Sequence, residues 1–307
     1  MTLAPLEGFQ SFATHHCITG SIRHVYVYND YDISEEMLLG LGAGVSFSYW
    51  HFKGQTPFMG GRGNVERPGV EGLEKTVGRR TGVEVESYST SSARKAERTL
   101  LEMLDAGQPV MIHCDMGFLP YFDFGDIDYH FGWHIVAVCG YDAETRQALI
   151  ADRDGLHPVS LEDLAKARGS TYKPFPPQHK WYTFAFSQKR PPTAEEVRQA
   201  IGEQVRGMLQ PPISNIGIQG IRKAAQQALK WPAQISEKDL RFTLFNMFIF
   251  IDATGGTGGG AFRYMFSRFL REAAEIAKDA RLKESAETFQ NIGDQWQQVA
   301  EIFKTGW

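Results

Sequence analysis

Apolar residues recur along the first 186 residues in two spacings, one typical of helices and one typical of strands. Helices are predicted over residues 15–28 and 93–106, and another begins after Ser34, which is a suitable N-cap residue. Short β-rich runs predict strands at residues 82–88, 109–114, 134–141, 147–152 and 180–186, with a short helix at residues 160–168. Helices come first and antiparallel strands follow, so this region is predicted to be an α+β domain.

A break in this pattern follows residue 186. The run Gln-Lys-Arg-Pro-Pro lies within residues 187–193, and two consecutive prolines exclude both a helix and a central strand. Mixed apolar and charged periodicity then predicts helices at residues 193–209, 216–230, 237–250, 262–280 and 284–303. We therefore expect two domains, an α+β domain over residues 1–186 and an all-helical domain over residues 193–307 that shapes or covers the cleft of the first.

Composition and charge exclude several classes of protein. The chain has 307 residues with 42% hydrophobic and 22% charged residues, which is ordinary for a globular protein, and its net charge of -4 offers no basic surface for nucleic acid. The apolar run over residues 244–251 contains Asn246 and is too short to cross a membrane. The N-terminus has no basic start or signal-length apolar stretch, and the three cysteines form no disulfide framework. We therefore expect a cytoplasmic protein without nucleic-acid or membrane partners.

Cys17 is the first candidate for chemistry. It lies at the beginning of a predicted helix, where free backbone N–H groups and the positive end of the helix dipole lower the pKa of a thiol. A lone cysteine is more often a small buried hydrophobe. However, histidines precede Cys17, and Thr19, Gly20 and Ser21 follow it, so the surrounding sequence is a poor core sequence. This context favours a nucleophile.

His134 and a nearby aspartate are the candidates for its base and orienting carboxylate. His134 begins the apolar strand 134–141, so it lies at the end of a strand and can face a cleft, although any single histidine can be satisfied by backbone hydrogen bonds. Counting across the hairpin sets His134 opposite Asp154 and diagonal to Asp152. We predict that Asp152 orients His134, because the strand ends at Asp152 and the following Arg-Asp-Gly reads as a turn.

Two segments of the sequence resemble a known family. The stretch from His16 to Gly42, and the segment from Gly132 to Asp142 followed by Ile-Ala-Asp152, resemble the butirosin biosynthesis protein H N-terminal family. The segment 253–263 resembles the helical domain of unknown function often attached to that family. The histidine segment is also similar in plan to the bacteriocin-processing cysteine peptidases of export transporters.

The resemblance implies a papain-like thiol acyltransferase of secondary metabolism. In such an enzyme the cysteine accepts an acyl group from a thioester donor, such as an acyl carrier protein, and passes it to a small amine. The catalytic residues would be Cys17, His134 and Asp152.

Papain-like enzymes usually carry an oxyanion-stabilising glutamine six residues before the cysteine, but here Ser11 stands at that position and Gln10 precedes it. The Cys17 backbone N–H is a partial substitute.

Two alternative functions share these residues. A papain-like peptidase or amidase would use water as the acceptor, and a binding protein could keep the fold without turnover. We expect no cofactor and no metal, because Gly132 and the β-branched run after it place His130 and His134 on a loop and a strand rather than on one helix face.

Two glycine-rich segments carry no nucleotide-binding signature. The glycines at positions 40, 42 and 44 follow a helix and are interpreted as a turn, because a dinucleotide-binding motif follows a strand. The loop 255–260 lacks the Lys-Ser/Thr of a phosphate-binding loop. It is either a close-packed helix start or a lining of the cleft into which Arg263 reaches.

Overall fold

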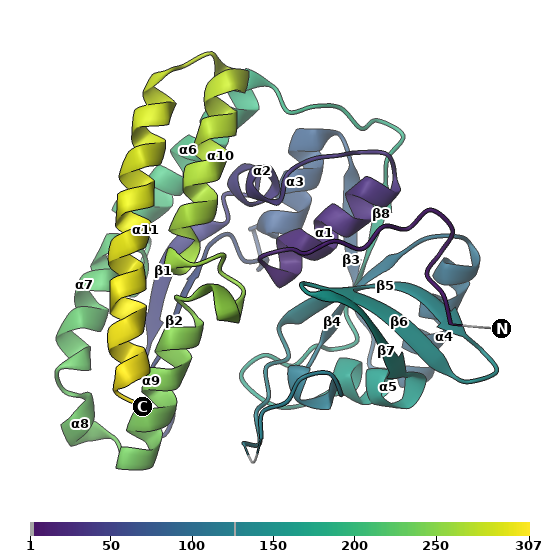
Figure 1. The fold of residues 1–307 in the computed structure, drawn as a ribbon, viewed down its shortest axis with the longest axis horizontal. Helices are drawn as coiled ribbons and strands as arrows, with labels where there is room; N and C mark the ends of the chain where they lie inside the picture. The colour runs from purple at the N-terminus through teal and green to yellow at the C-terminus, as the bar shows by residue number, and fades with distance from the viewer. Residues whose placement is uncertain (1–2, 126) are drawn as a thin grey trace. The chain divides into compact units, whose positions relative to one another are not determined.

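The computed structural model describes residues 3–125 and 127–307. The chain forms two compact units (Figure 1). The first contains the N-terminal residues up to Glu35 together with Val83–Lys189, and the second contains Glu36–Gly82 together with Arg190–Trp307. Within the described residues, no helix combines the length and the apolar character that a membrane span requires.

The first unit is built on a six-stranded antiparallel sheet. Its spatial order is β3 (Glu84–Tyr88), β8 (Trp181–Ala185), β4 (Val110–Cys114), β5 (His134–Asp142), β6 (Gln147–Asp152) and β7 (Gly155–Ser160). Helix α1 (Cys17–Tyr28) packs against β4, β5 and β6. Helix α4 (Ala93–Asp105) packs against β4 and β5, and α5 (Leu161–Gly169) packs against β4, β6 and β7. An antiparallel sheet with helices packed on it is consistent with the predicted α+β class.

Strand β5 supplies residues to two hydrophobic clusters because its side chains alternate between the faces of the sheet. Val136 and Val138 pack in a cluster that also contains leucines of α4 and α5, and Ala137 packs in a cluster with Phe9. The strand has a bulge between Val138 and Gly140, where the Cys139 carbonyl accepts a hydrogen bond of 2.7 Å from the Leu6 N–H.

The second unit combines a two-stranded sheet with helices. Strands β1 (Val45–Trp50) and β2 (Phe58–Arg62) pair antiparallel. The helices are α2 (Glu35–Leu41), which lies in this unit from Glu36 onward, α3 (Gly72–Thr81), α6 (Ala194–Leu209), α7 (Gly217–Ala228), α8 (Trp231–Gln234), α9 (Glu237–Ile249), α10 (Arg263–Ala277) and α11 (Arg281–Thr305). Phe47, Tyr49 and Met59 of the two strands share a core cluster with Trp231 and Met247.

The unit boundaries differ from the contiguous division expected from the sequence. The chain passes from the first unit to the second after Lys189, inside the expected linker, but residues 36–82 group with the C-terminal helices. The buried side chains of β1 explain this grouping, because Phe47 stacks on Trp296 and the Tyr49 hydroxyl accepts a hydrogen bond from the indole of Trp231. The expected division assigned residues 36–82 to the N-terminal domain.

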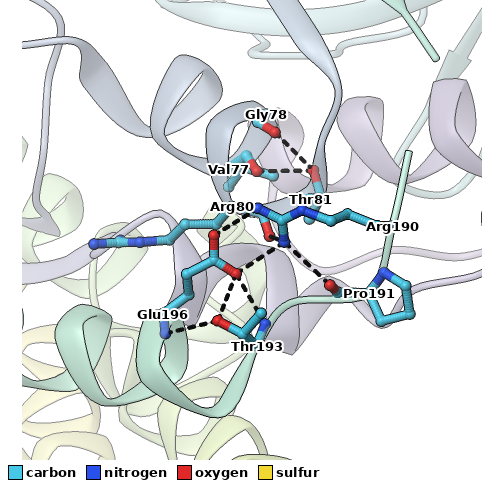
Figure 2. A network of polar contacts seen from close by, with 8 residues as sticks. All are labelled: Val77, Gly78, Arg80, Thr81, Arg190, Pro191, Thr193 and Glu196. Carbon is cyan, nitrogen blue, oxygen red and sulfur yellow. Dashed lines mark hydrogen bonds and ion pairs between the residues drawn. The ribbon is translucent and has the colours of Figure 1, made fainter. Parts of the chain in front are cut away.

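The linker leads into α6 through a network of charged and hydroxyl groups (Figure 2). The Arg190 guanidinium binds both carboxylate oxygens of Glu196, at 2.7 and 2.9 Å. The Thr193 side chain accepts a hydrogen bond from the Glu196 N–H, and the Glu196 carboxylate accepts one from the Thr193 N–H, which is a capping box. The Arg190 N–H also donates to the Thr81 carbonyl, which fastens the start of α6 to the end of α3.

The loop 255–260 is packed closely inside the second unit. A Cβ atom at Gly255 would lie 1.8 Å from the Ile249 carbonyl oxygen, and one at Gly260 would lie 2.7 Å from the Cα atom of Gly293. Arg263 is buried, and its guanidinium donates to the backbone carbonyls of Ala261 and Ser46. Close packing therefore explains why glycines occupy these positions. The Arg263 side chain joins two backbone segments of this unit.

Candidate active site

Cys17 is the first residue of α1, the position expected from the sequence. The residue is half-buried, whereas Cys114 and Cys139 are fully buried. The helix is fixed to the sheet beneath it, since the Ser21 hydroxyl donates to the Ile135 carbonyl of β5. Cys17 is therefore the most accessible of the three thiols.

The structure brings His134 and Asp152 into direct contact. The distance between His134 Nε2 and Asp152 Oδ2 is 2.6 Å, and both side chains are 3% exposed. The register of β5 and β6 pairs Ala137 with Ala151, so a continued ladder sets Asp152 diagonal to His134. Asp154 lies in the turn after β6 and binds His157 at 2.7 Å.

The imidazole also reaches the thiol. A side-chain hydrogen bond joins Cys17 and His134, and because Nε2 is held by Asp152, Nδ1 is the ring nitrogen that faces the sulfur. The Ile135 backbone N–H donates a further hydrogen bond to the sulfur. The three side chains therefore form a continuous chain from thiol to imidazole to carboxylate.

The pKa shifts follow from these contacts. Burial alone would raise the pKa of Cys17, but the hydrogen bond and charge of His134, the Ile135 N–H and the charge of Arg153 lower it below its ordinary value. Burial would lower the pKa of His134, but Asp152 and the thiolate raise it to about 9. Burial opposes ionisation of Asp152 as well, yet His134 holds the pKa of this carboxyl well below its usual range. The favoured state is a thiolate beside an imidazolium.

Tyr121 and Phe122 complete the surroundings of the His134–Asp152 pair. The Tyr121 hydroxyl donates to Asp152 Oδ2 at 2.9 Å, and its ring stacks on His157 at a centroid distance of 4.0 Å. The Phe122 ring meets the imidazole edge to face at 5.4 Å. The segment before β5 is rich in aromatic and acidic residues, but nothing in the sequence indicates which aromatic side chain meets the carboxylate.

Comparison with known families matches two segments of the chain. Residues 16–153 match the family described as butirosin biosynthesis protein H, N-terminal, and residues 162–306 match a domain of unknown function, DUF4872. The first of these matches covers somewhat less than half of the chain. The matched family is a biosynthesis-related enzyme family, and the family and two-domain order are those that the sequence resemblance indicated. No curated protein matches the sequence.

The matched segments do not follow the structural units. The first match includes residues 36–82, which lie in the second unit, and the second match begins inside α5 of the first unit. Cys17, His134 and Asp152 all lie within the butirosin biosynthesis protein H N-terminal match. The candidate site therefore lies within the first matched segment alone.

Glu35, the first residue of α2, contacts the N-terminus of α1 and was not identified as a site residue from the sequence. Its carboxylate accepts hydrogen bonds from the backbone N–H groups of His15 and His16 and from the Thr19 hydroxyl. Glu35 follows Ser34 in the sequence, in the first turn of its own helix, where a carboxylate suits the helix dipole. The largest effects that lower the pKa of Cys17 come from His134, followed by the Ile135 N–H and Arg153.

The other cysteines and histidines of the first unit have different environments. Burial raises the pKa of Cys114 and of Cys139 to about 12. His130 lies between the carboxylates of Asp115 and Asp128, at 2.9 and 3.1 Å. Among residues 3–125 and 127–307, no three His, Cys, Asp or Glu side chains are grouped as they would be to hold a metal ion.

The two residues considered for an oxyanion-binding side chain are both on the surface. Gln10 and Ser11 are exposed and belong to an irregular segment before α1. The backbone N–H of Cys17, at the first helical position, has no acceptor within its own helix. This N–H lies beside the nucleophile and is the available backbone donor for a developing oxyanion.

Proposed function

We propose that this protein is a thiol acyltransferase that moves an acyl group from a thioester donor to an amine through an acyl-enzyme at Cys17. The observation that carries the proposal is the chain of contacts from Cys17 to His134 to Asp152. A nucleophile within hydrogen-bond reach of a base, which is itself oriented by a third group, is the arrangement required for covalent acyl transfer.

The architecture of the first unit supports a papain-like assignment. The nucleophile starts a helix that packs against an antiparallel sheet, the base begins one strand, and the orienting carboxylate ends the next strand. This order is that of papain-like enzymes. The family match to a biosynthesis protein favours transfer in secondary metabolism, with a carrier protein as the thioester donor and a small amine as the acceptor.

Each residue has a defined step in this reaction. The Cys17 thiolate attacks the donor carbonyl, the carbon–sulfur bond to the donor breaks, and the departing thiolate takes a proton from the His134 imidazolium. The acyl group is then held as a thioester on Cys17. The acceptor amine attacks this thioester, His134 takes the amine proton, and Cys17 leaves as the thiolate. Asp152 keeps the His134 ring oriented throughout.

Mass spectrometry of the intact full-length protein tests the proposal. Incubation with a short-chain acyl thioester of N-acetylcysteamine should add one acyl mass, located on Cys17, and a panel of small amines should remove it with formation of an amide. Cys17→Ser should lose the thioester adduct, whereas the matched Cys139→Ala should keep it because Cys139 lies in the β5 bulge, outside the site.

The products decide between the possible reactions. Amide formation from the adduct supports transfer, and release of free acid with every amine tried would assign a hydrolase. An adduct of equal yield on the Cys17→Ser protein would overturn the nucleophile itself.

A further inference from the structure

The carboxylate of Glu35 is buried beside the nucleophile. Glu35 is 2% exposed. One oxygen accepts the His15 N–H at 2.7 Å, and the other accepts the His16 N–H at 2.6 Å and the Thr19 hydroxyl at 2.8 Å. Both oxygens are therefore occupied by groups that belong to the segment containing Cys17.

These contacts fix the backbone on both sides of Cys17. His15 and His16 precede it, and Thr19 lies two residues further along the first turn of α1. The N-cap residue His16 makes no capping hydrogen bond with its own side chain, so Glu35 satisfies a donor at this helix start from a distant position in the chain. The carboxylate thereby sets the direction in which the next N–H, that of Cys17, points.

We propose that Glu35 is a positioning residue for the oxyanion site, and that it acts by holding the His15–His16 backbone so that the Cys17 N–H is aimed at the reacting carbonyl. The inference rests on the proposed acyl transfer and assigns a further residue to it. The glutamine of papain-like enzymes stabilises the oxyanion, but here Gln10 and Ser11 are exposed. Glu35 contributes to this stabilisation indirectly, by positioning the backbone donor.

The charge and the geometry of Glu35 have opposite effects on the site. As a negative charge near the positive end of α1, it disfavours the Cys17 thiolate. As an acceptor of two adjacent backbone N–H groups, it favours the geometry of the oxyanion site. Burial raises the pKa of Glu35, and the three donors act against this shift. A substitution that removes the charge therefore separates the two effects.

Glu35→Gln provides this separation because the amide keeps the shape of the side chain but replaces one acceptor oxygen with a donor. We expect its acylation by the N-acetylcysteamine thioester to fall by roughly ten- to a hundredfold, since loss of one oxyanion donor costs about 10²–10³ and a misplaced donor is partly effective. We expect the pH profile of Cys17 alkylation by iodoacetamide to stay in place or move to lower pH, because a negative charge is lost.

Glu35→Asp gives the complementary result, and it serves as the second variant if the glutamine protein does not fold. It keeps the charge but is shorter by one methylene, so acylation should fall while the alkylation profile stays in place. Glu36→Gln is the matched control, since the same chemical change is made one residue later, in a side chain that pairs with Arg268 of the second unit. Its acylation rate should equal that of the wild type.

The two readouts distinguish failure of this inference from failure of the proposed function. Unchanged acylation in both Glu35 variants, or acylation and alkylation that fall together by the same factor, would overturn the positioning role. If the wild-type protein is never acylated at Cys17, the proposed function fails first and the positioning role fails with it.

Discussion

Replacing Asp152 by asparagine should remove the thiolate of Cys17 near neutral pH. Asp152 and His134 are each 3% exposed and 2.6 Å apart, so little water is available to replace the lost charge. With the carboxylate present, the pKa of His134 is raised to about 9 from an ordinary value of 6.5, which corresponds to about 3 kcal/mol in favour of the imidazolium. Without it, burial is opposed by the contact with Cys17 but no longer by the carboxylate, and we expect the imidazole to be neutral at pH 7.

The effect on Cys17 follows from the loss of its cationic partner. His134 is the main source of the lowered thiol pKa, so in Asp152→Asn this pKa should rise to about 9 or above. A thiol with a pKa of 9 is only ~0.3% ionised at pH 6.5, and its alkylation should be about three-hundredfold slower than that of a thiol that is fully ionised. Near pH 10 both proteins carry a thiolate, and the difference should disappear.

The assay is the rate of Cys17 alkylation by iodoacetamide between pH 5 and 10, measured by mass spectrometry. Asp154→Asn is the matched control, because it makes the same change two residues away in a side chain that is 76% exposed and binds His157. Its profile should equal that of the wild type. The electrostatic reasoning would be refuted if Cys17 of Asp152→Asn were alkylated at the wild-type rate at pH 6.5. It would also be refuted if the alkylation rate fell by the same factor at every pH.

Three further predictions concern the cysteines and the fold of the second unit. In the wild type at pH 7, iodoacetamide should label Cys17 before either of the other two cysteines, and peptide mapping that finds another site labelled first would contradict this. Hydrogen bonds from Arg190 lower the pKa of Glu196 to about 2. The ionised Glu196 therefore stabilises the folded protein above the unfolded pKa near 4.3, and this stabilisation is lost as the pH falls toward 2. Glu196→Gln should therefore lower the free energy of unfolding by about 1 kcal/mol at pH 6 but not at pH 2, as measured by urea denaturation. Gly255→Ala should destabilise the protein by about 2 kcal/mol or more, because its Cβ would meet a backbone carbonyl, whereas Gly207→Ala, with open space around it, should be neutral or stabilising by thermal melting.

Local sequence patterns were sufficient for most of the first unit. The helix at Cys17, the hairpin of β5 and β6 and the turn after Asp152 depend on neighbouring residues, and their predicted bounds lie within two residues of the observed ones. The proximity of Asp152 to His134 follows from the antiparallel register, which a short turn determines. A pair of residues on adjacent strands can thus be predicted from the sequence.

Contacts between distant segments were not predictable in the same way. Strands β1 and β2 were missed because the side chains that cover them, such as Trp231 and Trp296, follow roughly 180 or more residues later. Tyr121 and Glu35 were missed for the same reason. Each contacts the site only after the chain has folded, and the local sequence pattern does not specify which distant residues come together. An aromatic residue in a loop, or a glutamate in a first helical turn, can have several roles, and the sequence alone does not show which of them it has.

The position of Glu35 changes the physical explanation of the nucleophile. A cysteine at a free helix N-terminus gains thiolate character from the helix itself, and that was the expectation from the sequence. Here the buried Glu35 carboxylate accepts backbone N–H groups at the N-terminus, and the imidazolium of His134 is the main stabiliser of the thiolate. Because that imidazolium in turn depends on Asp152, the reactivity of Cys17 is determined by residues of two strands rather than by its own helix. The thiolate should therefore be lost when either member of the His134–Asp152 pair is neutralised, even though α1 and its N-terminal contacts remain intact.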